Sequence, residues 1–262
     1  MIRYIFYKLS HFHYHSVIGK ILRLPLKLIP SEAEVRILFG KLKGKKWIVD
    51  AGSHNYWLGG FEYHKQKIFE RMVKENSVVY DIGAHVGFYT LLASVLVGKN
   101  GKVYAFEPNP RNLNYLKKHL SINKVTNVEV VECAVSDKDG QCSFDIDKRH
   151  DLGHISETGS FIVKTHSLDS LVFSNQILPP DFIKIDVEGA EFQVLNGARR
   201  ILKEFAPVLI MDIHSEEIGK KCMELLTSFD YSFYPIEKKS LKGATELLAI
   251  YQKGKIATFP NP

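Results

Sequence analysis

The sequence contains little cysteine and no cysteine pattern. Its 262 residues include three cysteines, Cys133, Cys142 and Cys222, with no C-x-x-C pair among them. An odd number of scattered cysteines does not build a disulfide framework, so we expect reduced thiols and a cytoplasmic setting. Internal repeats and low-complexity tracts are also missing, and with 45% hydrophobic residues the chain can bury a large core.

Long apolar runs are missing as well. A membrane-spanning helix needs about 18 or more apolar residues in a row. Basic residues interrupt the opening segment too often for that: Arg3, Lys8, Lys20, Arg23 and Lys27. This segment also has no apolar core followed by small residues, so we do not expect a cleavable signal peptide.

The net charge of +6 is unevenly distributed. Residues 1–46 hold ten Lys and Arg against two Glu, or +8, and the remaining 216 residues carry 25 basic and 27 acidic groups, or −2. Ile2, Phe6 and Leu9 recur at helical spacing among the basic residues, which predicts a basic amphipathic helix. Such a helix can lie on an anionic membrane surface or pack on the body of the protein. We therefore expect a cytoplasmic protein, or one attached to a membrane surface.

From Ser77 onward, short apolar runs alternate with helix-length segments. The runs are "SVVYDIG", "KVYAFEP", "NVEVVECAV", "DFIKIDV" and "PVLIMDI", and "YSFYPI" and "TELLAIYQ" follow as two more strands. Helices are predicted over residues 86–98, 109–120, 188–204 and 215–228, and a polar loop over 147–159. This alternation predicts an α/β fold with a doubly wound, mostly parallel sheet and helices on both faces.

The first run ends in the turn "YDIGAHVGFYT", which lacks the G-x-G-x-x-G pattern of dinucleotide-binding enzymes. Gly83 and Gly87 are spaced G-x-x-x-G, and His85 and Phe88 stand where that pattern has glycines. Asp81 also puts a negative charge where a pyrophosphate would bind. These features favour a cofactor that carries an ammonium group and no phosphate, such as S-adenosylmethionine, whose sulfonium is also cationic.

The second run supports the same cofactor. It ends in Glu107, 24 residues past Gly83, where an acidic side chain can accept both hydrogen bonds of a ribose diol. The alternative interpretation is a tight glycine turn followed by a helix cap.

Four stretches together resemble one known family, the FkbM-type S-adenosylmethionine-dependent methyltransferases. They are "VVYDIGAHVGFYT", "VYAFEPNPRNLNYLKKHL", "SLDSL" and "IKIDVEGAEFQVLNGARRIL". The resemblance covers about residues 59–252 and implies a Rossmann-like sheet of seven strands, the last of them antiparallel. It also implies methyl transfer, usually to a hydroxyl of a glycan, a lipid-linked or a natural-product acceptor. We therefore divide the chain into a basic helical extension, residues 1–58, and a methyltransferase domain, residues 59–262.

The expected cofactor site combines the turn, the second run and the resemblance. It consists of Glu62, Asp81, Gly83, Ala84, His85, Gly87, Glu107, Ala134 and Asp186. The resemblance places Glu62 near the amino-acid end of the cofactor, and Ala134, just past the third run, should lie along the adenine. At His85 the family more often has Asn, which puts the details of the hydrogen bonding in doubt.

The stretch "IKIDVEGAEF" crowds three carboxylates behind an apolar run. Asp186 should end the fourth strand and face the site, where it could orient the methionine end of the cofactor or the acceptor. Glu188 and Glu191 should fall in the first helical turn, where an acid is favourable by about 0.3–1 kcal/mol. His214 is the best-placed neutral base, because its ordinary pKa is near neutrality, and Glu188 is an alternative. Helix capping is the alternative role for Asp186 and His214.

Two further possibilities concern metals and other acceptors. Asp186 and Asp212 could hold Mg²⁺, but no spaced His/Cys set accompanies them, so we expect no metal. A non-catalytic cofactor-binding module remains a rival interpretation. So does a nucleic-acid methyltransferase recruited by residues 1–46, although the (D/N)-P-P-(Y/F) signature is missing after the fourth run. The sequence leaves the oligomeric state open.

Overall fold

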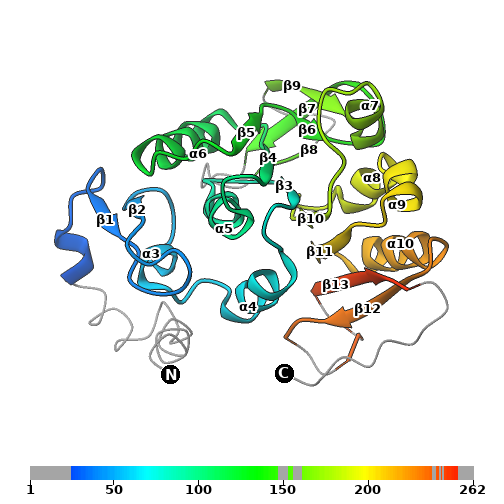
Figure 1. Cartoon of the computed structure of the whole chain (residues 1–262). Helices are drawn as coiled ribbons and strands as arrows, with labels where there is room; N and C mark the ends of the chain where they lie inside the picture. The colour runs from blue at the N-terminus through cyan, green and yellow to red at the C-terminus, as the bar shows by residue number, and fades with distance from the viewer. Residues whose placement is uncertain are drawn as a thin grey trace.

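The fold is organised around a seven-stranded sheet (Figure 1). The computed structural model describes residues 25–146, 153–155, 161–237, 240–241, 243 and 245–252. The strand order is β12-β13-β11-β10-β3-β4-β5, and β13 alone runs antiparallel to its neighbours in this sheet. The strands are β3 (Val78–Ile82), β4 (Lys102–Phe106), β5 (Val128–Val131), β10 (Phe182–Ile185), β11 (Val208–Asp212), β12 (Tyr231–Pro235) and β13 (Glu246–Tyr251). The predicted doubly wound, mostly parallel, seven-stranded sheet is confirmed.

Helices cover both faces of this sheet (Figure 1). On one face lie α4 (Tyr63–Met72), α5 (Phe88–Val97) and α6 (Pro110–Ile122), and on the other α7 (Leu168–Phe173), α8 (Glu191–Asn196), α9 (Arg199–Glu204) and α10 (Glu216–Thr227). The predicted start of α6 is confirmed, since the Asn109 side chain accepts a hydrogen bond from the Arg111 N–H and Pro110 is the first helical residue. Within the described residues, no helix combines the length and the apolar composition needed to cross a bilayer.

The segment after β10 differs from the prediction of one helix over residues 188–204. It forms two short helices, α8 and α9, separated at Gly197 and Ala198. A Cβ on Gly197 would lie 2.1 Å from the backbone oxygen of Ser136, so this glycine lets the helices pack closely against the chain after β5. The expected close packing at Gly197 is confirmed, and the expected single helix is wrong.

A second, four-stranded sheet lies beside the carboxyl end of β5. It consists of β6 (Ala134–Val135), β7 (Gly140–Ile146), β8 (Gly153–Ile155) and β9 (Phe161–His166), in the order β6-β9-β7-β8. The apolar run over 127–135 is therefore split between two sheets. The prediction of a loop over 147–159 is wrong for residues 153–155, which form β8 and pair antiparallel with β7. The rest of that loop lies outside the described residues.

The described part of the N-terminal extension is an antiparallel strand pair with short helices. It comprises η1 (Pro25–Leu28), β1 (Glu34–Arg36), β2 (Lys46–Ile48) and α3 (Asn55–Leu58). The predicted basic amphipathic helix belongs to residues 1–24, which lie outside the described residues. Trp47 is fully buried, stacked on His119 with ring centroids 3.8 Å apart. Residues on both sides of position 58 thus share one core, and the boundary at 58 stays a prediction.

Candidate active site

A cavity of about 380 Å³ opens at the carboxyl ends of β3, β4, β10 and β11, where ligands bind in open α/β sheets. Its volume is typical of small-molecule sites. Nine of the predicted site residues line this cavity: Glu62, Gly83, Ala84, His85, Glu107, Ala134, Asp186, Glu188 and His214. Asp81 and Gly87 are not in the lining. The structure thus brings together residues that are up to 152 positions apart in the sequence.

The turn after β3 forms the floor of the cavity. Gly83 has φ +74°, and a Cβ there would lie 1.9 Å from the backbone oxygen of Asp186, so only glycine fits. The N–H groups of Gly83 and Ala84 both donate to the Phe106 carbonyl, at 3.0 and 2.9 Å. At Gly87, a Cβ would lie 2.5 Å from Leu116 Cδ1, so this glycine serves the packing of α5 on α6.

Glu107 is a buried carboxylate held by backbone groups. It accepts hydrogen bonds from the N–H of His85 at 2.8 Å and of Asn109 at 2.9 Å. Burial raises the pKa of Glu107 to about 7, although these hydrogen bonds act in the opposite direction. Its contact with a cofactor ribose stays a prediction, and the fixed carboxylate on the cavity wall is compatible with it.

Replacing Glu107 by Gln tests this contact. We expect about 10–100-fold weaker binding of S-adenosylmethionine or its thioether product, because two hydrogen bonds to a charged acceptor would weaken. Isothermal titration calorimetry measures the effect. Glu129→Gln, at an exposed position of β5, is the matched control. If both variants bind the cofactor equally well, Glu107 does not contact it.

Asp81 lies behind the cavity wall and not on it. Its side chain is fully buried, accepts a hydrogen bond of 2.6 Å from Thr90 Oγ1 and lies 3.4 Å from the Lys184 ammonium. The expectation that the Asp81 carboxylate faces the ligand is therefore wrong. Lys184 compensates the charge of Asp81, which is not presented directly to a ligand.

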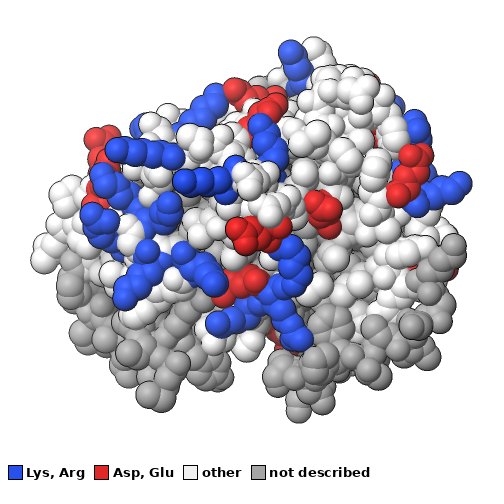
Figure 2. All heavy atoms as spheres, in the orientation of Figure 1, with Lys and Arg blue, Asp and Glu red and all other residues white. Residues whose placement is uncertain are grey.

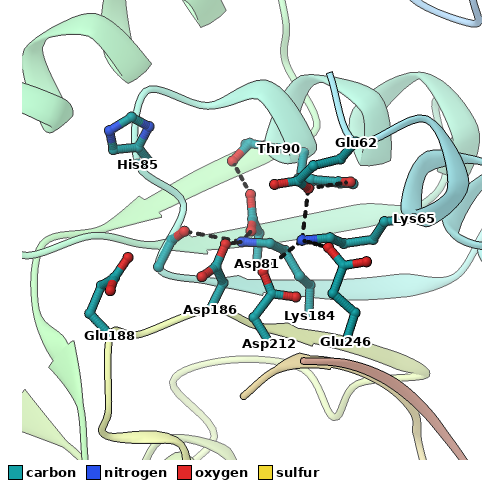
Figure 3. A network of polar contacts seen from close by, with 12 residues as sticks. Glu62, Lys65, Asp81, His85, Thr90, Lys184, Asp186, Glu188, Asp212 and Glu246 are labelled. Atoms are coloured by element: carbon teal, nitrogen blue, oxygen red, sulfur yellow. Dashed lines mark hydrogen bonds and ion pairs between the residues drawn. The ribbon is translucent and has the colours of Figure 1, made fainter. Parts of the chain in front are cut away.

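Two buried lysines organise the acids of the site, and sequence reasoning missed both (Figure 3). Lys184 in β10 lies 3.3 Å from Asp186 Oδ2 and donates to the Gly83 carbonyl at 3.2 Å. Burial lowers the pKa of Lys184, but Asp186 and Asp81 outweigh this effect and raise it above its ordinary value. A lysine inside the apolar run "FIKID" was the available sequence signal, because a charged residue in a buried strand needs partners.

Lys65 in α4 binds a second group of acids (Figure 3). Its ammonium lies 2.7 Å from Glu62, 2.6 Å from Asp212 and 3.0 Å from Glu246. The side chain of Lys65 is fully buried. This cluster joins the loop before α4 to β11 and β13, and it fixes Glu62 at the edge of the cavity.

Asp186 is ionised in this environment. Burial acts to raise its pKa, but Lys184, Lys65 and His214 outweigh burial and hold the pKa at about 2. The residue directly follows β10 and lines the cavity. The expected position of Asp186, at the end of the fourth parallel strand and facing the site, is thus confirmed. Its role stays a prediction.

His214 lies among three carboxylates. Its Nδ1 is 2.5 Å from Glu191 Oε1, and its Nε2 is 3.4 Å from Glu188 Oε2 and 3.9 Å from Asp186 Oδ1. The hydrogen bond to Glu191 and the nearby charge of Glu188 raise the pKa of His214 to about 9. The expectation of a neutral imidazole is therefore wrong for this arrangement, because a group with this pKa is protonated at neutral pH.

The two glutamates of the predicted helix start differ in position. Glu191 is the first residue of α8, as expected, and its side chain is fully buried. Glu188 precedes the helix, with φ +44°, a conformation that costs energy for a residue other than glycine. Its carboxylate is therefore placed by a strained loop and not by a helical turn.

The raised pKa of His214 predicts a pH dependence of stability. The ordinary pKa is 6.5 and the folded-state pKa is about 9, so the stabilisation is fully present below pH 6.5 and is lost as pH rises through 9. The side chain is 30% exposed, so we expect a loss of only about 1–2 kcal/mol in the free energy of unfolding. Urea unfolding in buffer with EDTA, between pH 6 and 9.5, measures this loss. A His214→Asn variant with the same slope as the wild type would contradict the assignment.

Comparison with known proteins identifies the family. Residues 81–234 match the model of the methyltransferase FkbM domain. The hexuronic acid methyltransferase AglP of Haloferax volcanii is 31% identical over 156 residues, covering 59% of this chain and 63% of the relative. An uncharacterized protein of Methanocaldococcus jannaschii is 26% identical over 167 residues, covering 61% of this chain and 59% of that one. This chain thus aligns with less than two thirds of the length of either relative.

One similar solved structure is also a methyltransferase FkbM. The methyltransferase FkbM of Methylobacillus flagellatus has 21% identity and a TM-score of 0.49, covering 67% of this chain and 43% of that one. The family match rests on the domain model, which spans more than half of the 262 residues. This chain therefore belongs to the FkbM family of S-adenosylmethionine-dependent methyltransferases.

Proposed function

We propose that this protein transfers the methyl group of S-adenosylmethionine to a hydroxyl group of a sugar, free or as part of a lipid-linked glycan. The observation that carries the proposal is the charge of the cavity. Five carboxylates line it against one lysine and two histidines: Glu62, Glu107, Asp186, Glu188, Asp212, Lys184, His85 and His214. Such a cavity attracts a cation and repels a phosphate-bearing nucleotide, which fits the sulfonium and ammonium of this cofactor.

The chain would contribute positioning and proton removal. Bound S-adenosylmethionine supplies a methyl group that is already activated by the sulfonium charge. Holding the acceptor oxygen in line with that methyl group can contribute about 7–11 kcal/mol. We assign orientation to Asp186, which stays ionised, and proton removal to Glu188, whose effect on rate would be about 10²–10⁴-fold. His214, protonated at neutral pH, would hold both carboxylates in place.

The relative in Haloferax volcanii, which is described as a hexuronic acid methyltransferase, supports this choice of acceptor class. A sugar that carries a carboxylate is therefore the first acceptor to test. The test is transfer of labelled methyl from S-adenosylmethionine to oligosaccharides with and without a hexuronic acid, followed by identification of the labelled product. Label in the uronic-acid ring supports the proposal. Cofactor binding without any transfer would favour the non-catalytic module, and label in RNA or DNA would favour a nucleic-acid methyltransferase.

We also propose that the protein acts in the cytoplasm, at a membrane surface. Figure 2 shows Lys and Arg side chains gathered where α6, β1 and β2 lie in Figure 1. We define the basic surface as Arg36, Lys41, Lys43, Lys45 and Lys118, none of which forms an ion pair with another described residue. The basic segment 1–24 precedes this surface in the sequence. Unpaired basic residues attract anionic lipid headgroups by about 1 kcal/mol each.

Reversing three of these charges tests the membrane contact. We expect Lys41→Glu, Lys43→Glu and Lys45→Glu together to weaken binding to phosphatidylglycerol vesicles by about 100-fold or more. Methylation of a soluble acceptor should not change, because these residues do not line the cavity. Vesicle co-sedimentation at low and moderate salt measures binding. A variant with Lys220→Glu and Lys221→Glu on α10 is the control, and equal loss in both variants would contradict a defined surface.

A further inference from the structure

We propose that Asp186, Glu188 and His214 bind a divalent transition-metal ion in the cavity. The catalytic role of this ion rests on the proposed methyl transfer. Its binding to the three side chains does not. The three side chains each offer one donor atom, and these atoms all lie within 4.8 Å of one another. The two distances from His214 Nε2 are 3.4 Å to Glu188 Oε2 and 3.9 Å to Asp186 Oδ1. Metal–ligand bonds of about 2.0–2.2 Å bring donor atoms to about 3–4 Å separation, so small side-chain movements suffice.

Glu191 and Lys184 each orient one of the donor side chains, so that the free donor atom faces the other ligands. Glu191 Oε1 lies on Nδ1 of His214, at 2.5 Å, so Nε2 is the nitrogen that faces the carboxylates. Lys184 lies 3.3 Å from Oδ2 of Asp186, so Oδ1 is the oxygen on the His214 side. Carboxylate–histidine pairs of this kind support metal-binding imidazoles, because they fix the tautomer and the ring orientation.

A buried carboxylate with an unused oxygen gives a second, independent indication. The Glu191 side chain is fully buried and directed at His214, and its Oε2 has no hydrogen-bond partner among the described residues. With Asp186 and Glu188, it makes three carboxylates around one imidazole. Buried anions need compensating positive charge, and a divalent ion on Nε2 would supply more of it than one proton on the imidazole.

The donor set also indicates the kind of ion. One imidazole nitrogen and two carboxylate oxygens suit Mn²⁺, Fe²⁺ or Zn²⁺ better than Ca²⁺ or Mg²⁺, which prefer oxygen alone. Since Asp186, Glu188 and His214 line the cavity, the acceptor hydroxyl would bind beside the ion. There the oxygen would lose its proton to the second oxygen of Glu188 and form the new C–O bond. The S–C bond would break at the same time, with its electron pair returning to sulfur.

The test is metal binding by the full-length protein, which does not depend on activity. After treatment with EDTA and removal of the chelator, Mn²⁺ is added and followed by electron paramagnetic resonance and calorimetry. We expect one bound ion, and about 100-fold weaker binding or more in His214→Asn and in Glu188→Gln. His166→Asn in β9 is the matched histidine control and should bind as the wild type does. Circular dichroism shows whether each variant is folded.

The outcomes separate this inference from the proposed function. Binding that is lost in both site variants and kept in the control supports the metal site, whatever the acceptor proves to be. Binding that persists in His214→Asn would overturn the site and would point to the other histidines, including His11, His13 and His15 in the sequence. Unchanged methyl transfer in a protein shown to be metal-free would overturn the catalytic purpose of the ion while leaving the methyltransferase proposal intact.

Discussion

Replacing Asp186 by Asn is expected to lower the rate of methyl transfer by about 10²–10⁴-fold while changing cofactor affinity much less. The carboxylate lies 3.3 Å from Lys184 and faces His214, and its pKa of about 2 keeps it ionised at neutral pH. Asparagine has nearly the same shape without the charge, so the variant removes orientation of the reacting groups rather than volume. Single-turnover transfer of labelled methyl measures the rate, and calorimetry with the thioether product measures affinity.

Asp230→Asn is the matched control for this experiment. Asp230 lies outside the cavity lining and has φ +60°, which asparagine tolerates. If Asp186→Asn transfers methyl as fast as this control, the role of Asp186 is structural, at the start of the segment after β10. If the variant loses cofactor binding and rate to the same extent, Asp186 is a binding residue and the assignment of orientation is wrong.

Replacing Gly83 by Ala is expected to destabilise the fold by about 2–5 kcal/mol, the sum of two independent costs. A left-handed backbone conformation costs an alanine about 1–2 kcal/mol, and Gly83 has φ +74°. The added Cβ would also lie 1.9 Å from the backbone oxygen of Asp186, where β3 and β10 run side by side. Neither atom belongs to a flexible side chain, so the two strand ends must separate.

Gly44→Ala isolates the first of these costs. Gly44 has φ +86°, and a Cβ there would have no atom within 4 Å. The free energy of unfolding, measured with urea, should therefore fall by about 1–2 kcal/mol in Gly44→Ala and by clearly more in Gly83→Ala. Equal losses would show that the close approach of β3 and β10 at the cavity floor is not as described.

The parts of the fold that were predictable are those encoded in local patterns. The strands β3, β4, β10 and β11 follow from continuous apolar runs, and the start of α6 follows from Asn109 and Pro110. The same patterns failed where neighbouring residues enter different sheets. The run over 127–135 contains no glycine or proline, so no turn signal in it marks the change from β5 to β6. Such a change depends on β9, which supplies the partner strand for β6.

The site residues that follow strand ends were predictable. The contacts between charged side chains that are far apart in the sequence were not. Asp186 and His214 follow parallel strands, so their meeting at one edge of the sheet could be expected. Lys65 gave no signal in the sequence, because its partner Asp212 lies 147 positions away. The expectation for His214 was wrong because its pKa is raised by Glu191, the first residue of α8, and the sequence did not show that these two side chains meet.

The packing of Trp47 has a practical consequence for anyone who wishes to express the catalytic body alone. A fragment beginning at residue 59 would lose the indole and, with it, the hydrogen bond of 3.1 Å from the Ile48 N–H to His119 Nε2. Water would then reach His119, whose pKa burial lowers to about 4. The imidazole could gain a proton on Nε2, the nitrogen that the Ile48 N–H had occupied, while Nδ1 stays hydrogen-bonded to the Val86 carbonyl. A usable fragment should therefore retain β1 and β2, although family resemblance starts only after them.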